Sequence, residues 1–159
     1  MKHLLILLVC MYSSLSQAEG CTTRELVKLE DIARCAKNGD TTAQFLLGQL
    51  YFQGKEVPRS YNTAFRWMSK AANQGNKSAQ NSLGFDYYNG WGTKKDHVRA
   101  YMWWSLSIVN NEEPVTRRNL DSLEEKLSSA DLERAQRMAS AWLANRQPPS
   151  QTEVRSPPR

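Results

Sequence analysis

The sequence predicts an all-α protein, a solenoid of stacked helix pairs, and three observations support this. Residues 41–76 and 77–112 repeat each other at an offset of 36 residues without a gap. Within each repeat, apolar residues recur at spacings of three and four, which is the period of an α-helix. Repeats of roughly 20 to 50 residues are typical of stacked arrays, whose units bury each other's apolar faces. Such arrays mostly bind other macromolecules.

The repeat is carried by identical residues. Nine positions of the first unit are identical 36 residues later. They pair as Ala43 with Ala79, Gln44 with Gln80, Leu47 with Leu83, Gly48 with Gly84, Tyr51 with Tyr87, Gly54 with Gly90, Ala64 with Ala100, Trp67 with Trp103 and Ser69 with Ser105.

Each unit is predicted to hold two helices. In the first unit these run from about 41 to 53 and from about 61 to 73. Gly54 follows the first helix as a left-handed cap, and Ser60 precedes the second as an N-cap. Gly48 lies inside the first helix, where glycine costs about 1 kcal/mol relative to alanine. Because it recurs as Gly84, we expect a second helix to approach closely at this position.

The pattern A-x-x-x-L-G-x-x-Y-x-x-G, followed by a short loop, A-x-x-W and AA-x-x-G, resembles the Sel1-like repeat, a relative of the tetratricopeptide repeat. Residues 43–76 match it almost throughout, and residues 79–92 and 100–103 match in the second unit. Ser107 and Ile108 replace the small pair of the first unit, as in a unit turning into a cap. The resemblance implies a right-handed superhelix that serves as an adaptor for other proteins.

Residues 1–18 are interpreted as a secretory signal peptide. A positive start at Lys2 precedes the apolar run 4–12, and Ser16-Gln17-Ala18 offers the small residues that a signal peptidase recognises. The run is shorter than the roughly 20 residues needed to span a bilayer. The mature chain would begin at Glu19, without stable membrane insertion. The alternative is a buried N-terminal helix.

Cys21 and Cys35 remain after removal of Cys10 with the signal. An even number of cysteines in an oxidising compartment predicts a disulfide, here tying the N-terminus to the predicted end of a helix. The alternative makes Cys21 a lipidated first residue, although Ala18-Glu19-Gly20 fits a lipobox poorly. Two cysteines and one mature histidine do not make a four-ligand zinc site.

The flanking segments are predicted to be caps and a tail. Residues 19–40 hold a lone helix over 22–38, equivalent to the second helix of a unit, with Leu26, Leu29 and Ile32 facing the first full unit. Residues 113–146 form a closing helix pair, opened by Pro114 and by Ser128. The proline-rich residues 147–159 are predicted to be disordered.

Composition argues against several function classes. The net charge of +5 is modest and its basic residues are scattered, so a nucleic-acid partner is not expected. The mature chain keeps only His97, which is interpreted as a surface or packing residue. A Ser-x-x-Lys motif, a nucleophile elbow and a glycine-rich phosphate loop are all absent from the sequence. We therefore expect a non-enzymatic protein without cofactor or metal.

Partner binding is assigned to positions that differ between the units. One stripe of the first helix differs, and the loop residue Trp91, between two glycines, is a candidate for exposure. The candidate partner-binding residues are Phe45, Gln49 and Phe52, their counterparts Asn81, Phe85 and Tyr88, and Trp91. The competing interpretation is that Phe45 and Phe85 fill the core between units. Trp67 and Trp103 recur, and are therefore assigned to the core.

The sequence thus favours an exported adaptor, with the periplasm preferred over secretion or lipid anchoring. Envelope assembly, control of a signalling receptor and neutralisation of a toxic effector by an immunity protein are its three candidate tasks. One alternative is a small envelope enzyme acting on peptidoglycan or a β-lactam. Some disulfide-rich members of the resembled family have been described as β-lactamases, but the chain lacks their cysteine pair in every unit. The other alternative is a secreted factor acting on a host protein.

Overall fold

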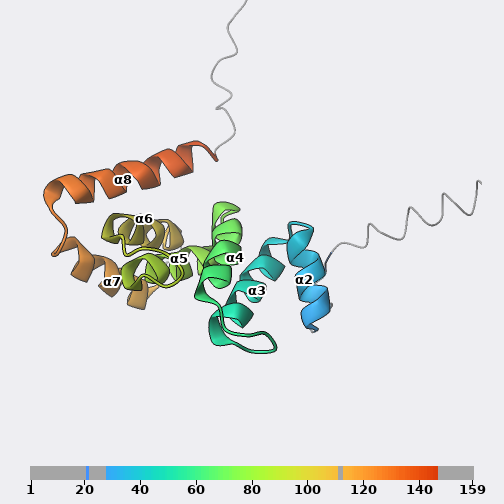
Figure 1. The fold of residues 1–159 in the computed structure, drawn as a ribbon. Coiled ribbons are helices and arrows are strands. Elements are labelled where there is room, and N and C mark those ends of the chain that lie inside the picture. The colour runs from blue at the N-terminus through green and yellow to red at the C-terminus, as the bar shows by residue number, and fades with distance from the viewer. Residues whose placement is uncertain (1–20, 22–27, 111–112, 147–159) are drawn as a thin grey trace, which may run out of the picture.

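The computed structural model describes residues 21, 28–110 and 113–146, which form seven helices and no strand. The helices are α2 (Leu29–Lys37), α3 (Thr41–Gln53), α4 (Tyr61–Asn73), α5 (Lys77–Asn89), α6 (His97–Ser107), α7 (Pro114–Glu124) and α8 (Ser129–Ala144). They follow one another from α2 at one end to α7 and α8 at the other (Figure 1). The predicted all-α solenoid is confirmed, with α3–α4 and α5–α6 as its two repeated pairs.

Local sequence signals explain where the helices of the units begin. The side chains of Asp40 and Asn76 cap α3 and α5, and those of Ser60 and Asp96 cap α4 and α6. Each accepts a hydrogen bond from the amide three residues further on, at 2.7 to 3.2 Å. These bonds satisfy amides that have no partner within the helix.

Glycine determines where the first helix of each unit ends. Gly54 follows α3 with a φ of 71°, and Gly90 follows α5 with a φ of 80°. Both lie in the left-handed region that favours glycine, so the predicted caps are confirmed.

The units are joined by a hydrogen bond that repeats along the stack. The Gln44 amide of α3 donates to the carbonyl of Ala36 in α2, and the Gln80 amide of α5 donates to that of Ala72 in α4, both at 3.2 Å. These carbonyls lie in the last turn of their helices, where intrahelical partners are missing. The lone helix α2 therefore supplies the first full unit with the same contact that α4 supplies to the second.

Gly48 and Gly84 are the points of close helix approach, as expected. A Cβ atom built on Gly48 would lie 3.0 Å from the Met68 side chain of α4. One built on Gly84 would overlap the indole of Trp104 in α6, which is 2% exposed. A missing side chain at these positions allows the two helices of each unit to pack against each other.

The hydrophobic core runs along the stack as three neighbouring clusters. The first joins α2 and α3, the second joins α4, α5, α6 and α8, and the third joins α6 to α7 and α8. Trp103 is buried in the second cluster, whereas Trp67 is partly buried against the first, with the Lys70 ammonium over its ring.

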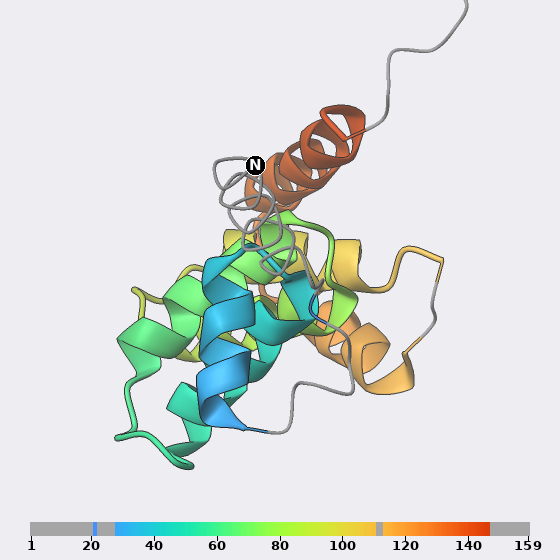
Figure 2. The ribbon, with the colours of Figure 1, turned by 90° about the vertical axis from the view of Figure 1, so that its right-hand side faces the viewer.

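The C-terminal pair closes the stack around α6. Helices α7 and α8 both pack on α6, and α8 projects beyond the helix pairs when the molecule is viewed from its α2 end (Figure 2). Arg146, just after α8, donates to the carbonyls of Asn73 and Gln74 at the end of α4. The end of the chain's last helix therefore contacts the end of the first unit.

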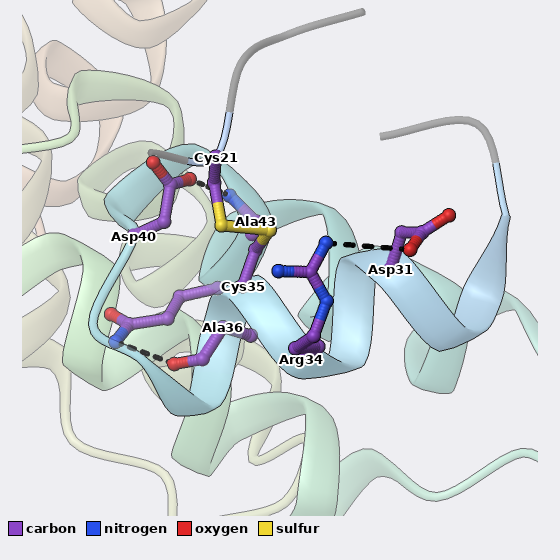
Figure 3. The surroundings of a disulfide bond; sticks show 8 residues. Cys21, Asp31, Arg34, Cys35, Ala36, Asp40 and Ala43 are labelled. Carbon is purple, nitrogen blue, oxygen red and sulfur yellow. Dashed lines mark hydrogen bonds and ion pairs between the residues drawn. A yellow bond between two sulfur atoms is a disulfide. The ribbon is translucent and has the colours of Figure 1, made fainter. Parts of the chain in front are cut away.

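Cys21 and Cys35 form a disulfide across 14 residues (Figure 3). Cys35 is completely buried in the first cluster, and α2 as described begins at Leu29. The predicted start of this helix at 22, the contact of Leu26, the signal peptide 1–18 and the tail 147–159 lie outside the described residues. Of the helices described, none has the length and apolarity required to cross a membrane.

Candidate protein-binding site

Aromatic side chains from both units meet on the surface at the joint between them. Phe52 near the end of α3, Tyr61 at the start of α4 and Trp91 after α5 form a cluster with ring centroids 5.2 to 6.1 Å apart. Tyr61 and Trp91 are stacked and are 37% and 36% exposed, which is unusual for such large rings. Exposed aromatic groups of this kind are enriched at protein interfaces.

A glycine positions Trp91 in this cluster. The Trp91 amide donates to the Asp86 carbonyl at 2.9 Å, which ties the loop to the end of α5. Gly92 then adopts a φ of 68°, and a Cβ atom there would overlap the backbone carbonyl of Tyr61. Glu56, at the same place in the first unit, also has a positive φ of 61°. Because a residue other than glycine adopts this conformation in the first unit, the glycine is needed mainly for space: without a side chain, the loop of the second unit can lie directly against α4.

Beside the aromatic cluster lies a cavity of about 270 Å³, named here the inter-repeat pocket. Its walls come from α3, α4, α5 and the loop after α5. The lining residues are Gln49, Phe52, Gln53, Met68, Ser82, Phe85, Asp86 and Trp91. The walls are predominantly apolar, with a small number of polar groups, as is usual for ligand pockets.

Asp86 is the one ionisable residue among those lining the pocket. It is only 4% exposed, and burial raises the pKa of its carboxyl group to about 7. Within the described residues no ion pair to this carboxylate is formed, and burial is the cause of its raised pKa. Its oxygens are not among the fully enclosed polar atoms without a partner, so the carboxylate is accessible from the pocket. A largely buried carboxylate without a cation is energetically unfavourable, and a ligand in the pocket could reach this one.

The structure brings together four of the seven predicted partner-binding residues. Gln49, Phe52, Phe85 and Trp91 all line the inter-repeat pocket. Phe85 also packs edge-on against Trp104 at 5.1 Å, so it serves the core as well.

The other three do not line this pocket. Phe45 is packed against the second core cluster. The Tyr88 ring lies beside those of His97 and Trp104, with centroid distances of 5.2 and 5.6 Å, and lines a neighbouring cavity together with Phe85 and Trp91. Asn81 lines a separate small cavity with Lys77.

Two residues of the site were not identified from the sequence. Asp86 occupies the position that Leu50 holds in the first unit, so a charge at an apolar repeat position was the available signal. Tyr61 has no such signal, because its contact with Trp91 depends on the backbone approach at Gly92.

Across residues 28–110 and 113–146, no three histidine, cysteine, aspartate or glutamate side chains are grouped so that they could hold a metal ion. The site offers aromatic faces, amides, a hydroxyl group and one carboxylate, which suit binding.

Comparison with known proteins agrees with this architecture. The family model described as Sel1 repeat matches residues 41–76 and 77–108. The chain therefore contains two Sel1 repeats. No match was found among curated proteins.

Two solved structures are similar to this chain. One is c5321, described as a protective antigen present in uropathogenic Escherichia coli strains displaying an SLR fold, with 31% identity and a TM-score of 0.66. The match covers 82% of this chain and 30% of that one. The other is a Sel1 repeat protein from Oxalobacter formigenes, with 35% identity and a TM-score of 0.57, covering 60% of this chain and 27% of that one. The chain thus spans less than a third of either structure.

Proposed function

We propose that the protein is a non-enzymatic adaptor that binds another protein at the joint between its two Sel1 repeats. The observation that carries this proposal is the aromatic cluster of Phe52, Tyr61 and Trp91 beside the inter-repeat pocket, in which the Tyr61 and Trp91 rings are exposed. Stacked repeats commonly present such surfaces to partner proteins. Binding energy at protein interfaces concentrates in a few large aromatic or arginine anchors, and this cluster supplies them.

The proposal includes export. Residues 1–18 have the composition of a secretory signal, and the disulfide between Cys21 and Cys35 suits an oxidising compartment. We favour the periplasm, where envelope assembly, receptor control and immunity are the candidate tasks. Intact-mass measurement of the exported protein tests this part. A mass starting at Glu19 is expected, and an acylated Cys21 would contradict a soluble mature chain.

Partner binding is tested by quantitative capture from envelope extract, with the protein as bait. Phe52→Ala and Trp91→Ala should each weaken a captured partner by about 1 kcal/mol or more, because each removes an anchor from the joint. Val115→Ala is the control, since Val115 is 48% exposed on α7 and does not line the inter-repeat pocket.

The two aromatic variants must also be shown to fold. Circular dichroism melts should show both folded, because neither ring is fully buried: Phe52 is half-buried and Trp91 is 36% exposed. Folded variants that capture the same partners as the unchanged protein would refute the proposed surface.

A further inference from the structure

The repeat itself does not require a carboxylate at the position of Asp86. In the first unit the same position is Leu50, a half-buried residue that packs against the first core cluster. The second unit replaces this leucine with a carboxylate that is 4% exposed. An apolar residue at this position would avoid the desolvation of a charged group. The substitution therefore indicates a ligand that the carboxylate serves.

We propose that the inter-repeat pocket binds an arginine side chain of the partner protein, with its guanidinium group paired to the Asp86 carboxylate. This inference rests on the proposed function, because it names the chemistry of the partner at the same site. The carboxylate is the one ionisable group lining the pocket, and within residues 28–110 and 113–146 no cation is paired with it. A positive group from outside supplies the missing partner.

The walls of the pocket favour arginine over lysine. A guanidinium group is planar, stacks on aromatic faces and is weakly hydrated, and Phe52, Phe85 and Trp91 supply such faces. It also carries five N–H donors in a fork that fits a carboxylate bidentately. The Gln49 and Gln53 amide oxygens are additional acceptors on the α3 wall. A lysine ammonium is compact and strongly hydrated, and would leave these groups unused.

Burial makes the ionisation of the Asp86 carboxyl group depend on a cation in the pocket. The raised pKa of Asp86, about 7, results from desolvation alone, with no stabilising charge nearby. A guanidinium group that enters the pocket favours the ionised form and lowers this pKa. Because Asp86 is only 4% exposed, a charge-assisted hydrogen bond to its carboxylate is less screened by water than the same bond on the surface.

The test uses N-acetyl-arginine methylamide as the probe, titrated into the 15N-labelled protein. Saturable shifts of the Trp91 indole and Ser82 amide signals are expected, because both residues line the pocket. N-acetyl-citrulline methylamide has nearly the same shape without the charge and should bind at least tenfold more weakly. The N-acetyl-lysine methylamide should also bind more weakly. Equal binding of citrulline would overturn the ion pair, and equal binding of lysine would overturn the assignment to arginine.

Variants of Asp86 test whether its charge is the one that binds arginine. Asp86→Asn removes the charge, and Asp86→Leu introduces the residue that the first unit has at this position. Both variants should fold and bind the arginine probe at least tenfold more weakly. Asp121→Asn, at an exposed position on α7, is the matched control and should bind normally. Arginine binding that survives in both folded Asp86 variants would refute the proposal.

The failure of this inference is distinguishable from failure of the proposed function. If Asp86→Asn captures the partner as well as the unchanged protein while Trp91→Ala loses it, the aromatic surface stands and the arginine assignment is wrong. If none of these variants affects capture, the proposed surface itself is wrong. Loss of capture in both Asp86→Asn and Trp91→Ala, with arginine binding lost in Asp86→Asn, supports both.

Discussion

The buried carboxylate of Asp86 predicts a specific pH dependence of stability. Burial raises the pKa of this group from 3.8 to about 7. Between these values the folded protein holds a proton that the unfolded chain has already released. The contribution of Asp86 to the free energy of unfolding therefore falls as the pH rises from about 4 to about 7, and then stays constant. Asp86→Asn removes the titrating group with little change of shape.

The size of the change in the free energy of unfolding follows from the pKa shift. One pKa unit corresponds to about 1.4 kcal/mol, so a shift from 3.8 to about 7 changes the free energy of unfolding by at most about 4 kcal/mol. Relative to the unchanged protein, Asp86→Asn should gain stability progressively across this pH range, up to that ceiling. Other titrating groups affect both proteins alike, and their contributions cancel in the difference.

Urea unfolding followed by circular dichroism at several pH values between 4 and 8 measures this difference. Asp121→Asn serves as the control for loss of a carboxylate at an exposed position. A difference for Asp86→Asn that does not change with pH would show that the carboxylate is ionised and compensated in the folded protein. That result would refute both the calculation and the interpretation of an unpaired group.

Two further predictions concern the packing between helices and the disulfide. Gly84→Ala should destabilise the protein by about 1–3 kcal/mol in urea unfolding, because the buried Trp104 cannot move aside. Gly48→Ala should be close to neutral, because the new methyl group meets the flexible Met68 side chain and alanine gains about 1 kcal/mol of helix propensity over glycine. Equal effects of the two substitutions would contradict the packing described. Reduction of the disulfide between Cys21 and Cys35 should lower the free energy of unfolding by about 3 kcal/mol, and free thiols in the denatured, unreduced protein would show that the bond is absent.

The sequence predicted the helices well because their ends are determined locally. The Ser60 and Asp96 side chains cap amides within three residues, and Gly54 and Gly90 supply the left-handed turns. The predicted helices 41–53 and 61–73 match α3 and α4 to the residue. A 36-residue repeat also predicted the stacking order, since each unit needs the next to bury its apolar faces.

The candidate site was less predictable because its contacts are not local. Helical spacing placed Phe45, Gln49 and Phe52 on one stripe, but only the last two reach the inter-repeat pocket. Phe45 is at the opposite end of the stripe, where α3 packs against the second core cluster. Helical periodicity specifies a face of a helix, whereas the neighbours that cover each part of this face depend on how the units stack.

Three departures of the second unit from the first meet at one place in the fold. Leu50, Lys55 and Glu56 are replaced, 36 residues later, by Asp86, Trp91 and Gly92. The aspartate and the tryptophan line the same cavity, and the glycine lets their loop approach α4.

The repeat itself needs neither Asp86 nor Trp91, because the first unit has Leu50 and Lys55 at these positions. A largely buried carboxylate without a cation carries a cost in folding. In a repeat protein the shared residues maintain the stack, so the joint at which such differences collect is the place to expect binding. The inter-repeat pocket lies at this joint.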